Sequence, residues 1–439
     1  MGETRFLLNE IADSSAKFGV DWLGQRRVDA VRTLKEQGLP HKKTEAWRFT
    51  PTAELQRTRF MSARVPTNPD ALIARVQREL GPDDGTLRII VVDGAPQISA
   101  LSLPKGVRVS VLEEAIGRDE TLQQSLLQIA NSEHFSALNA IAFQDGVLID
   151  IEKNATVELP IHLVHISSGN EALTGDETPT LSHPRVLVRA GINSAFRLVE
   201  TVLGAANEAH MDNLVVELDL DAGARVDHVR VHQTLGKTIS SISIRQGRNS
   251  HYASHVITMG GKLLRSELHI HLSGEGAECN LDGAYFVANE DHVDHRTVVE
   301  HHVPRGTSRQ RYRGVVDNKG TAVFDGIVIV HPNAQKTEAH QENRNLLLSE
   351  SARVHTKPHL EIEADDVKCS HGATVGTLDQ DQLFYLRARG VPNALAKNML
   401  TLAFVRSIAE GIVESVVADR VDRLLTEAFS SGEALKDEA

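Results

Sequence analysis

The chain has 439 residues, of which 41% are hydrophobic, 24% are charged and 4% are aromatic, and its formal net charge is −12. This length allows two or three domains, and the composition is that of a globular protein. An acidic chain lacks the positive field that binding to nucleic acid or to an anionic membrane requires. The scarcity of aromatic residues also disfavours platforms on which bases stack.

The sequence also indicates a compartment. No apolar run reaches the length of a membrane-spanning helix, and the N-terminus, MGETRFLLNE, has no apolar core of signal-peptide length. Two cysteines, Cys279 and Cys369, are too few for a disulfide framework and are typical of a reducing compartment. We therefore expect a cytoplasmic protein that binds neither nucleic acid nor membrane.

Residues 1–145 predict an N-terminal α/β domain. Apolar residues between Val20 and Gly38 recur at helical spacing, and the helix should end at Gly38. The segment Ile89 to Asp93, IIVVD, predicts a strand. Asp119 to Ala130 predicts a further helix, with Asp119 as its N-cap.

Residues 146–377 follow a different pattern, in which short alternating strands are separated by turns rich in Gly, Asn, Asp and Ser. A unit of strand, turn, small residue and strand recurs, mostly at intervals of about 26 to 30 residues. The small residue falls at Ala155, Ala195, Ala224, Ser250, Ala277, Ala322 and Ala352. A strand-only repeat of this length predicts the stacked coils of a parallel β-helix, in which each coil buries its inner face against the next. A β-sandwich is the alternative, but two-residue hairpin turns such as Asn-Gly are largely absent.

Residues 378–439 predict a C-terminal helical domain. Thr377 to Gln380 matches a capping box for a first helix, which should end at Gly390. Pro392 can open a second helix, because the first turn does not need its missing N–H. A third helix is expected from Ser415 to Phe429, before a polar tail.

Histidines suggest one possible metal site. Sixteen of the 21 lie from His210 onward, and neutral imidazole is a common metal ligand. His269 and His271 share one face of a predicted strand, and Glu275 follows, which resembles the first metal motif of the cupins. A cupin-like metalloenzyme using these three residues is therefore an alternative function, although Arg309 stands where the fourth ligand would be. The remaining histidine pairs are expected at surfaces or turns: His251/His255, His292/His295 and His301/His302.

A second candidate metal site lies at the junction with the C-terminal helices, in DDVKCSHGATVG at 365–376. Cys369 and His371 alternate onto one face of a strand, and a thiolate beside an imidazole suits iron or zinc. Two ligands do not complete a tetrahedral site, so the others would have to come from elsewhere, such as another subunit. The alternative is a buried structural cysteine beside a histidine at an interface.

Sequence signatures of catalysis are absent. The chain has no Gly-rich phosphate loop ending in Lys-Ser/Thr, no HExxH, no CxxC and no nucleophile elbow. A β-helix enzyme acting on carbohydrate is a further alternative, disfavoured by the few aromatics and by the lack of an identifiable carboxylate pair. We expect a binding or assembly protein and not an enzyme.

Four segments resemble the SufB/SufD family of iron–sulfur cluster assembly proteins. The most specific is KCSHGATVGTLDQDQLFYLRARGV at 368–391; the others are GLPHKKTEAWRFTP at 38–51, HPRVLVRAG at 183–191 and NRNLLLS at 343–349. Within the family the details favour the SufD type. SufB carries Cys-Asp-Ser where this chain has Asn345, Leu346 and Leu347, and Glu-His-Glu where it has Ser370, His371 and Gly372.

The resemblance implies a mainly β fold, a right-handed parallel β-helix flanked by N-terminal α/β and C-terminal helical domains. It implies a heterodimer with SufB, and binding of the ABC-type ATPase SufC through the C-terminal helices. The apolar residues expected to contact the ATPase are Phe384, Tyr385, Leu386, Met399 and Phe404.

The resemblance also assigns the candidate metal ligands. Cys369 and His371 match the SufD residues expected at the SufB interface, where a transient iron–sulfur cluster forms. No tightly bound cofactor is expected in the isolated chain, and whether that chain forms a homodimer is left open. Cys279 matches no family cysteine and is expected in the core.

Overall fold

The computed structural model describes residues 22–63, 66, 68–81, 85–98, 102–129, 133–169, 178–206, 209–409, 411–412 and 415–430. The expectations for the N-terminal segment before residue 22 and for the polar tail lie outside these residues. The helices are α2 (Trp22–Gln37), η1 (Glu45–Trp47), α3 (Ala53–Arg57), α4 (Asp70–Leu80), α5 (Leu112–Ile116), η2 (Glu120–Gln124), α6 (His134–Ala142), α7 (Gln380–Ala388), α8 (Asn393–Ala409) and α9 (Ser415–Ser430).

The strands are short in the N-terminal part and mostly nine to eleven residues long in the centre. They are β1 (Met61–Ser62), β2 (Leu87–Val92), β3 (Ala95–Gln97), β4 (Val107–Val111), β5 (Val147–Ile151), β6 (Ile161–Ile166), β7 (Thr180–Ser182), β8 (Arg185–Ala190), β9 (Ala195–Gly204), β10 (His210–Leu220), β11 (Arg225–His232), β12 (Lys237–Gln246), β13 (His251–Met259), β14 (Leu263–Leu272), β15 (Glu278–Val287), β16 (His292–His301), β17 (Thr307–Val316), β18 (Thr321–Val330), β19 (Glu338–Leu347), β20 (Arg353–Ile362) and β21 (Lys368–Gly376).

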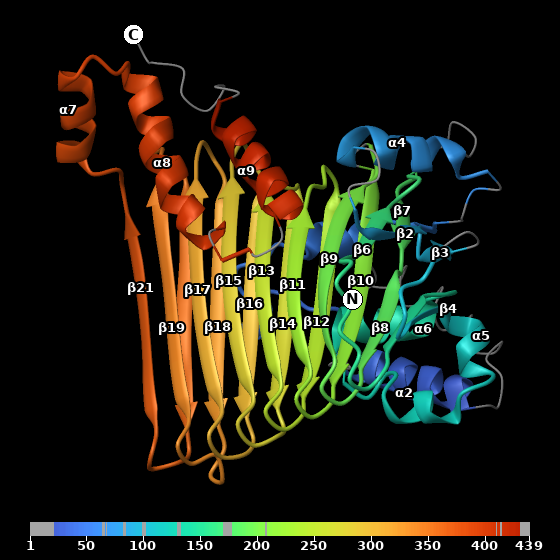
Figure 1. The fold of residues 1–439 in the computed structure, drawn as a ribbon. Coiled ribbons are helices and arrows are strands. Elements are labelled where there is room, and N and C mark those ends of the chain that lie inside the picture. The colour runs from blue at the N-terminus through green and yellow to red at the C-terminus, as the bar shows by residue number, and fades with distance from the viewer. Residues whose placement is uncertain are drawn as a thin grey trace.

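The strands form two sheets of a solenoid with about seven turns (Figure 1). Even-numbered strands from β8 to β20 follow one another in the first sheet, called sheet A, and odd-numbered strands from β9 to β21 in the second, called sheet B. Each coil therefore adds one strand to each sheet, in parallel register with the coil before it. Among the described residues, antiparallel pairing joins only β2 to β3 and β4 to β5. The predicted parallel β-helix with flanking α/β and helical parts is confirmed, and the sandwich alternative is wrong.

Alternate residues of each strand point between the two sheets and form one continuous apolar core. In neighbouring strands of sheet A, Val216, Ile242 and Leu268 are at most 1% exposed and stack in register. Sheet B contributes residues such as Val226, Tyr252 and the free Cys279 to the same core. The β-branched and aromatic side chains suit this pleated, buried surface. The prediction that Cys279 lies in the core is confirmed.

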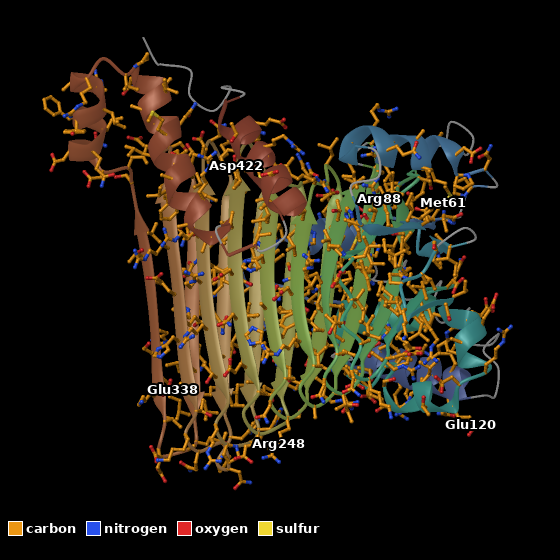
Figure 2. The ribbon with its side chains drawn as sticks, in the orientation of Figure 1. Met61, Arg88, Glu120, Arg248, Glu338 and Asp422 are labelled. Carbon is orange, nitrogen blue, oxygen red and sulfur yellow. The ribbon has the colours of Figure 1, made fainter. Side chains whose placement is uncertain are left out.

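One corner of the solenoid explains the repeated small residue. Asn193, Gly223, Asn249 and Gly276 occupy equivalent turns with φ between 53° and 72°, a conformation that Gly and Asn adopt at low cost. The residue after each is buried: Ser194, Ala224, Ser250 and Ala277. Figure 2 shows Arg248, from one of these turns, and Glu338, from a later coil, along the same lower edge of the sheets.

Three of the small residues from the predicted repeat are out of phase with this corner, which leads into strands of sheet B. One of them, Ala352, comes directly before β20 of sheet A and so lies at the other corner. Ala195 lies one residue beyond the first corner, as the first residue of β9, so Ser194 holds the stacked position. Ala322 lies within β18, where it faces the core. Each coil has two turns of similar composition, one before each of its strands. The repeat predicted from the sequence took small residues from both turns and treated them as one position.

Helices α2 and α6 cover part of the outer face of sheet A, while α4 packs on β6 and β9 of sheet B. Leu34 of α2 and Phe135 of α6 pack with Ile239 and Leu263 of the sheet in one buried cluster. Trp47, 3% exposed, joins this cluster. The predicted helix that ends before Gly38 and the strand at residues 89–93 are confirmed as α2 and β2. The predicted helix after Asp119 is the short 3₁₀ helix η2, although Asp119 does cap it by accepting from the N–H of Thr121.

The C-terminal helices cover part of the outer face of sheet B. Helices α8 and α9 lie over strands of this sheet (Figure 1). Val405 and Ile408 of α8 and Leu425 of α9 pack on Val229 and Ile257. The three predicted helices are present, but the predicted cap is wrong. Asp379 caps α7, because its carboxylate accepts from the N–H groups of Asp381 and Gln382. Thr377 belongs to the short segment between β21 and that cap.

A buried ionic cluster fastens the segment 38–51 to sheet A. Arg265, fully buried, lies with its guanidinium carbon 3.9 Å from the ring centroid of Trp47. Its Nη1 donates to Asp294 Oδ2, as does the Thr50 hydroxyl, and its Nη2 donates to Glu267 Oε1 at 2.6 Å. The charge of Arg265 is thereby paired and the indole ring covers it.

We expect Trp47→Ala to destabilise the fold by about 3 to 5 kcal/mol, because it leaves a cavity and uncovers the buried guanidinium. Urea unfolding of the full chain measures this loss. The matched control is Phe49→Ala, since Phe49 is 40% exposed and stacks on His355; it should cost no more than about 1.5 kcal/mol. Equal losses in the two variants would contradict the role given to the Arg265 cluster.

Candidate functional site

The last coil of the solenoid is open to solvent. Strands β20 and β21 are the terminal strands of sheets A and B, so within the described residues neither has a further strand on its outer edge. Ile362 and Val375 of these strands are 43% and 46% exposed. A terminal repeat normally carries a polar or capped end, because an uncapped coil exposes its core positions and its backbone donors and acceptors.

Cys369 and His371 lie on β21, on the face that continues the interior of the solenoid. Their register partners on β19 are Ala339 and Gln341, both almost fully buried. The Cys369 side chain packs against the end of the core and is partly buried, while His371 is exposed. Partial burial raises the pKa of the Cys369 thiol, so this sulfur becomes a ligand only when a metal or a nearby cation favours the thiolate.

The metal site around Cys369 and His371 is incomplete within the described chain. No third His, Cys, Asp or Glu from the described residues gathers with them into a group that could hold an ion. Both residues are therefore at most part of a ligand set. Their role as ligands stays a prediction, as does the alternative of a structural cysteine.

A row of buried polar residues leads to this open end, which we call the interior polar seam: Glu200, His228, Arg230, His295, Gln310 and Gln341. Near the end, Thr297 Oγ1 donates to Gln310 Oε1 at 2.7 Å, and Gln341 Nε2 donates to the same oxygen at 3.3 Å. His371 pairs with Gln341 in register, so it extends the seam to solvent.

The deeper part of the seam holds ionisable groups out of water. Burial raises the pKa of Glu200 to about 7, with the nearby Arg230 charge opposing the shift. Burial and the same arginine hold the pKa of His228 well below its ordinary value. The Nε2 atoms of His165 and His228 lie 4.0 and 3.9 Å from Glu200 Oε2.

The expectation that the paired histidines lie at surfaces or turns is wrong for most of them. His295 and His301 are at most 1% exposed and point into the solenoid, while His255 and His292 are 8% and 7% exposed. Alternation along a strand separates inward from outward positions, but the sequence does not say which set faces the core when both carry polar residues.

The cupin alternative is also wrong. Cupins are antiparallel jelly rolls, whereas β14, which carries His269 and His271, pairs in parallel with β12 and β16. Glu275 does not join the two histidines; its Oε1 instead accepts from Arg305 Nη1 at 2.5 Å.

The residues expected to bind an ATPase divide into two groups. Phe384 and Tyr385 of α7 and Met399 of α8 are 72%, 57% and 46% exposed. Leu386 is partly buried, and Phe404 packs with the cluster under α8, where the Arg313 guanidinium lies 5.1 Å from its ring centroid. Leu395, 51% exposed, was not predicted and belongs with the exposed group.

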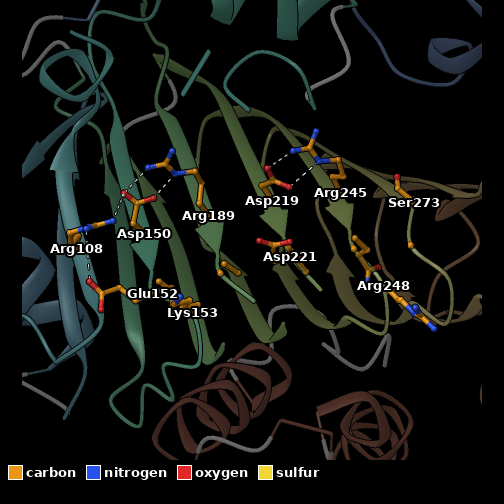
Figure 3. Close-up of a pocket in the computed structure, with 17 residues that line it drawn as sticks. Arg108, Asp150, Glu152, Lys153, Arg189, Asp219, Asp221, Arg245, Arg248 and Ser273 are labelled. Atoms are coloured by element: carbon orange, nitrogen blue, oxygen red, sulfur yellow. Dashed lines mark hydrogen bonds and ion pairs between the residues drawn. The ribbon is translucent and has the colours of Figure 1, made fainter. Parts of the chain in front are cut away.

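A charged groove of about 860 Å³ lies on the outer face of sheet A, beside β5, β8, β10 and β12 (Figure 3). Its long side chains mostly neutralise one another. Arg189 Nε donates to Asp150 Oδ1 at 2.5 Å, and Arg245 Nε donates to Asp219 Oδ1 at 2.9 Å. The groove is therefore lined by a ladder of ion pairs and does not present a surface of one charge sign.

These features define a class of protein, a two-sheet parallel β-solenoid with a potential ligand pair at an open end and exposed apolar helices beside it. Comparison with known sequences gives the family. The description "SUF system FeS cluster assembly, SufBD core domain" matches residues 170–404, and "SufBD protein N-terminal region" matches residues 7–163. The chain belongs to the SufB/SufD family of iron–sulfur cluster assembly proteins.

Individual relatives agree over nearly the whole length. An iron–sulfur cluster assembly SufBD family protein of Synechocystis is 33% identical, covering 89% of this chain and 87% of the relative. The iron–sulfur cluster assembly proteins SufD of Escherichia coli and Bacillus subtilis are 29% and 25% identical, covering 89% and 90% of this chain and 89% and 93% of theirs. None of the helices in the described part of the chain has the length and apolar character needed to cross a membrane.

We expect Glu200→Gln to change how stability depends on pH. The folded pKa of Glu200, about 7, lies above its ordinary value of 4.5. Its contribution to stability is therefore complete below pH 4.5 and is lost as the pH rises through 7. Glutamine cannot ionise, so the wild type should lose about 3 kcal/mol relative to the variant between pH 4.5 and 8.

Urea unfolding at several pH values tests this, with Glu217→Gln as the control. Glu217 is fully buried and accepts from Arg185 Nη2 at 2.5 Å. Breaking that pair should cost about 3 to 5 kcal/mol. Parallel pH profiles for the wild type and Glu200→Gln would contradict the raised pKa.

Proposed function

We propose that this chain is the SufD-type subunit of a scaffold that also contains a SufB-type subunit and a SufC-type ATPase. In this proposal the open end of the solenoid contacts SufB, and the exposed surface of α7 and α8 binds the ATPase. The iron–sulfur cluster is a transient cargo that forms between the subunits. The observation that carries the proposal is the uncapped last coil, which bears Cys369 and His371 on its interior face.

An open solenoid end is suited to a partner of similar fold. The outer edges of β20 and β21 can continue their ladders by pairing with strands of another chain. Such a partner would cover Ile362 and Val375 and enclose His371. It could also supply the ligands that a cluster needs beyond Cys369 and His371. Without that partner, the same edges would accept a second copy of this chain.

The exposed side chains of α7 and α8 form the second proposed interface. Phe384, Tyr385, Leu395 and Met399 are all at least 46% exposed, on two helices that pack on each other. Exposed aromatic and methionine side chains gathered in one place are typical of the core of a protein–protein interface. The Arg389 guanidinium carbon lies 3.7 Å from the Tyr385 ring centroid and keeps that ring in position.

His371→Ala should leave folding and complex formation intact, because the imidazole is exposed and its loss costs little stability. The iron and sulfide content of the complex co-expressed with SufB and SufC should fall several-fold. His340→Ala is the matched control: this exposed histidine is on the neighbouring strand β19, and its Nδ1 lies 2.8 Å from Ser370 Oγ. Full cluster loading in the double variant Cys369→Ala/His371→Ala would show that the cluster forms elsewhere.

Phe384→Ala/Tyr385→Ala should weaken ATPase binding at least tenfold, because truncated interface aromatics commonly cost 2 kcal/mol or more. Titration of the ATPase into the purified variant measures this. The control is Leu235→Ala, whose side chain is 61% exposed on the turn before β12. Point substitutions are preferable to deletion after residue 377, which would uncover Val229 and Ile257 on sheet B. Unchanged affinity would refute this interface.

A further inference from the structure

A cluster of three imidazoles and one carboxylate lies on the outer face of sheet A, away from the interior position of Cys369 and His371. His271 lies on β14 and Glu300 on β16, and the two are register partners. His302 follows β16 and His331 follows β18. We call these four residues the outer histidine cluster. All four side chains are partly exposed, between 22% and 35%.

The ligand atoms of the cluster are close together. His271 Nδ1 lies 3.3 Å from His302 Nε2 and 3.6 Å from Glu300 Oε1. His302 Nε2 is 3.8 Å and His331 Nε2 is 3.2 Å from Glu300 Oε2. Ligand atoms bound tetrahedrally at 2.0 to 2.1 Å from an ion are about 3.3 Å apart, so these separations need only small adjustments.

The simplest alternative is that His271 continues the ladder of ion pairs on this face. The ladder follows strand register through six residues: Asp150, Arg189, Asp219, Arg245, His271 and Glu300. In that alternative a charged His271 would pair with Glu300. It gives no reason for His302 and His331 to direct their Nε2 atoms to the same carboxylate.

The arrangement of the rings favours neutral imidazoles that all bind the same ion. The His302 and His331 rings stack with centroids 4.6 Å apart and an interplanar angle of 13°, and His271 stacks on His302 at 5.6 Å. Three protonated rings this close would repel one another, and one carboxylate cannot neutralise them. A divalent cation would let all three imidazoles be neutral donors while it balances Glu300.

We propose that the outer histidine cluster binds one divalent transition-metal ion, with His271, Glu300 and His302 as direct ligands. His331 orients the Glu300 carboxylate or completes the coordination. The donor set selects ions such as Zn²⁺, Co²⁺ or Fe²⁺, because imidazole suits them, and it disfavours Mg²⁺ and Ca²⁺, which take oxygen ligands. The register of the coils brings His271, Glu300, His302 and His331 together from three successive coils, so a bound ion would also link these coils. This proposal does not depend on the proposed function.

The test uses the full chain in the Cys369→Ala/His371→Ala background, so that the open end contributes no ligand. Metal-free protein is titrated with Co²⁺, whose visible absorption reports four- or five-coordinate nitrogen and oxygen ligation. We expect one equivalent to bind and Zn²⁺ to displace it. His271→Ala, His302→Ala and Glu300→Gln should each weaken binding about 100-fold or more, and His331→Ala about 10-fold, in line with the loss of a ligand or of its support.

The control is His251→Ala, because His251 also faces a carboxylate, Glu278, with Nδ1 and Oε2 3.5 Å apart. It should leave Co²⁺ binding unchanged. Melting temperatures with and without Zn²⁺ check folding: the metal-dependent rise should occur in the control and vanish in His271→Ala/His302→Ala. The proposal is overturned if metal-free protein binds no stoichiometric Co²⁺, or if the double variant binds it as well as the control.

Discussion

The parallel register between successive coils is the constraint on which the rest of this structure depends. Each coil pairs residue for residue with the coil before it, so a side chain has its register partner directly above or below it. A single coil cannot bury its inner face, and only stacking excludes water from it. A slip of one residue would turn every buried side chain to the opposite face. The turns with positive φ and a buried small residue fix that register once per coil.

The same stacking aligns polar residues into rows as strictly as it aligns apolar ones. Inside, it produces the interior polar seam, in which Glu200 is held with a raised pKa and Gln341 Nε2 donates to Gln310 Oε1. Outside, it produces the ladder from Asp150 to Glu300. A row of polar residues in such a fold is therefore a consequence of the register. A separate explanation is needed only where the row stops alternating acidic and basic residues, as it does at the three imidazoles around Glu300.

Sequence alone predicted the solenoid because its cause, a turn with a small residue in each coil, is local and recurs along the chain. It did not predict which face of a strand is buried. His295 stands between two charged residues, Asp294 and Arg296, so the sequence around it does not distinguish the two faces, yet it lies inside the solenoid and is 1% exposed. The outer histidine cluster was missed for a different reason, because His271, Glu300 and His331 are about one coil apart in the sequence and meet only through the register of the coils. The spacing of Cys369 and His371 indicated a candidate ligand pair, but their expected place at an interface with SufB came from family resemblance alone.

The two candidate metal sites differ in how their ligands are supplied. The outer histidine cluster draws its donors from three successive turns, so one chain can complete it. At the open end the stacking stops, and among the described strands β21 has a neighbour on one side only. His371 and Cys369 therefore lack the next coil, which is where further ligands would come from in a continuing solenoid. A partner that continues the coils would replace that missing neighbour. An ion or cluster assembled at the open end would lose part of its ligands when the partner separates, and this loss would allow the release that a cargo site requires. An ion bound to the outer histidine cluster would stay, because all of its ligands belong to one chain.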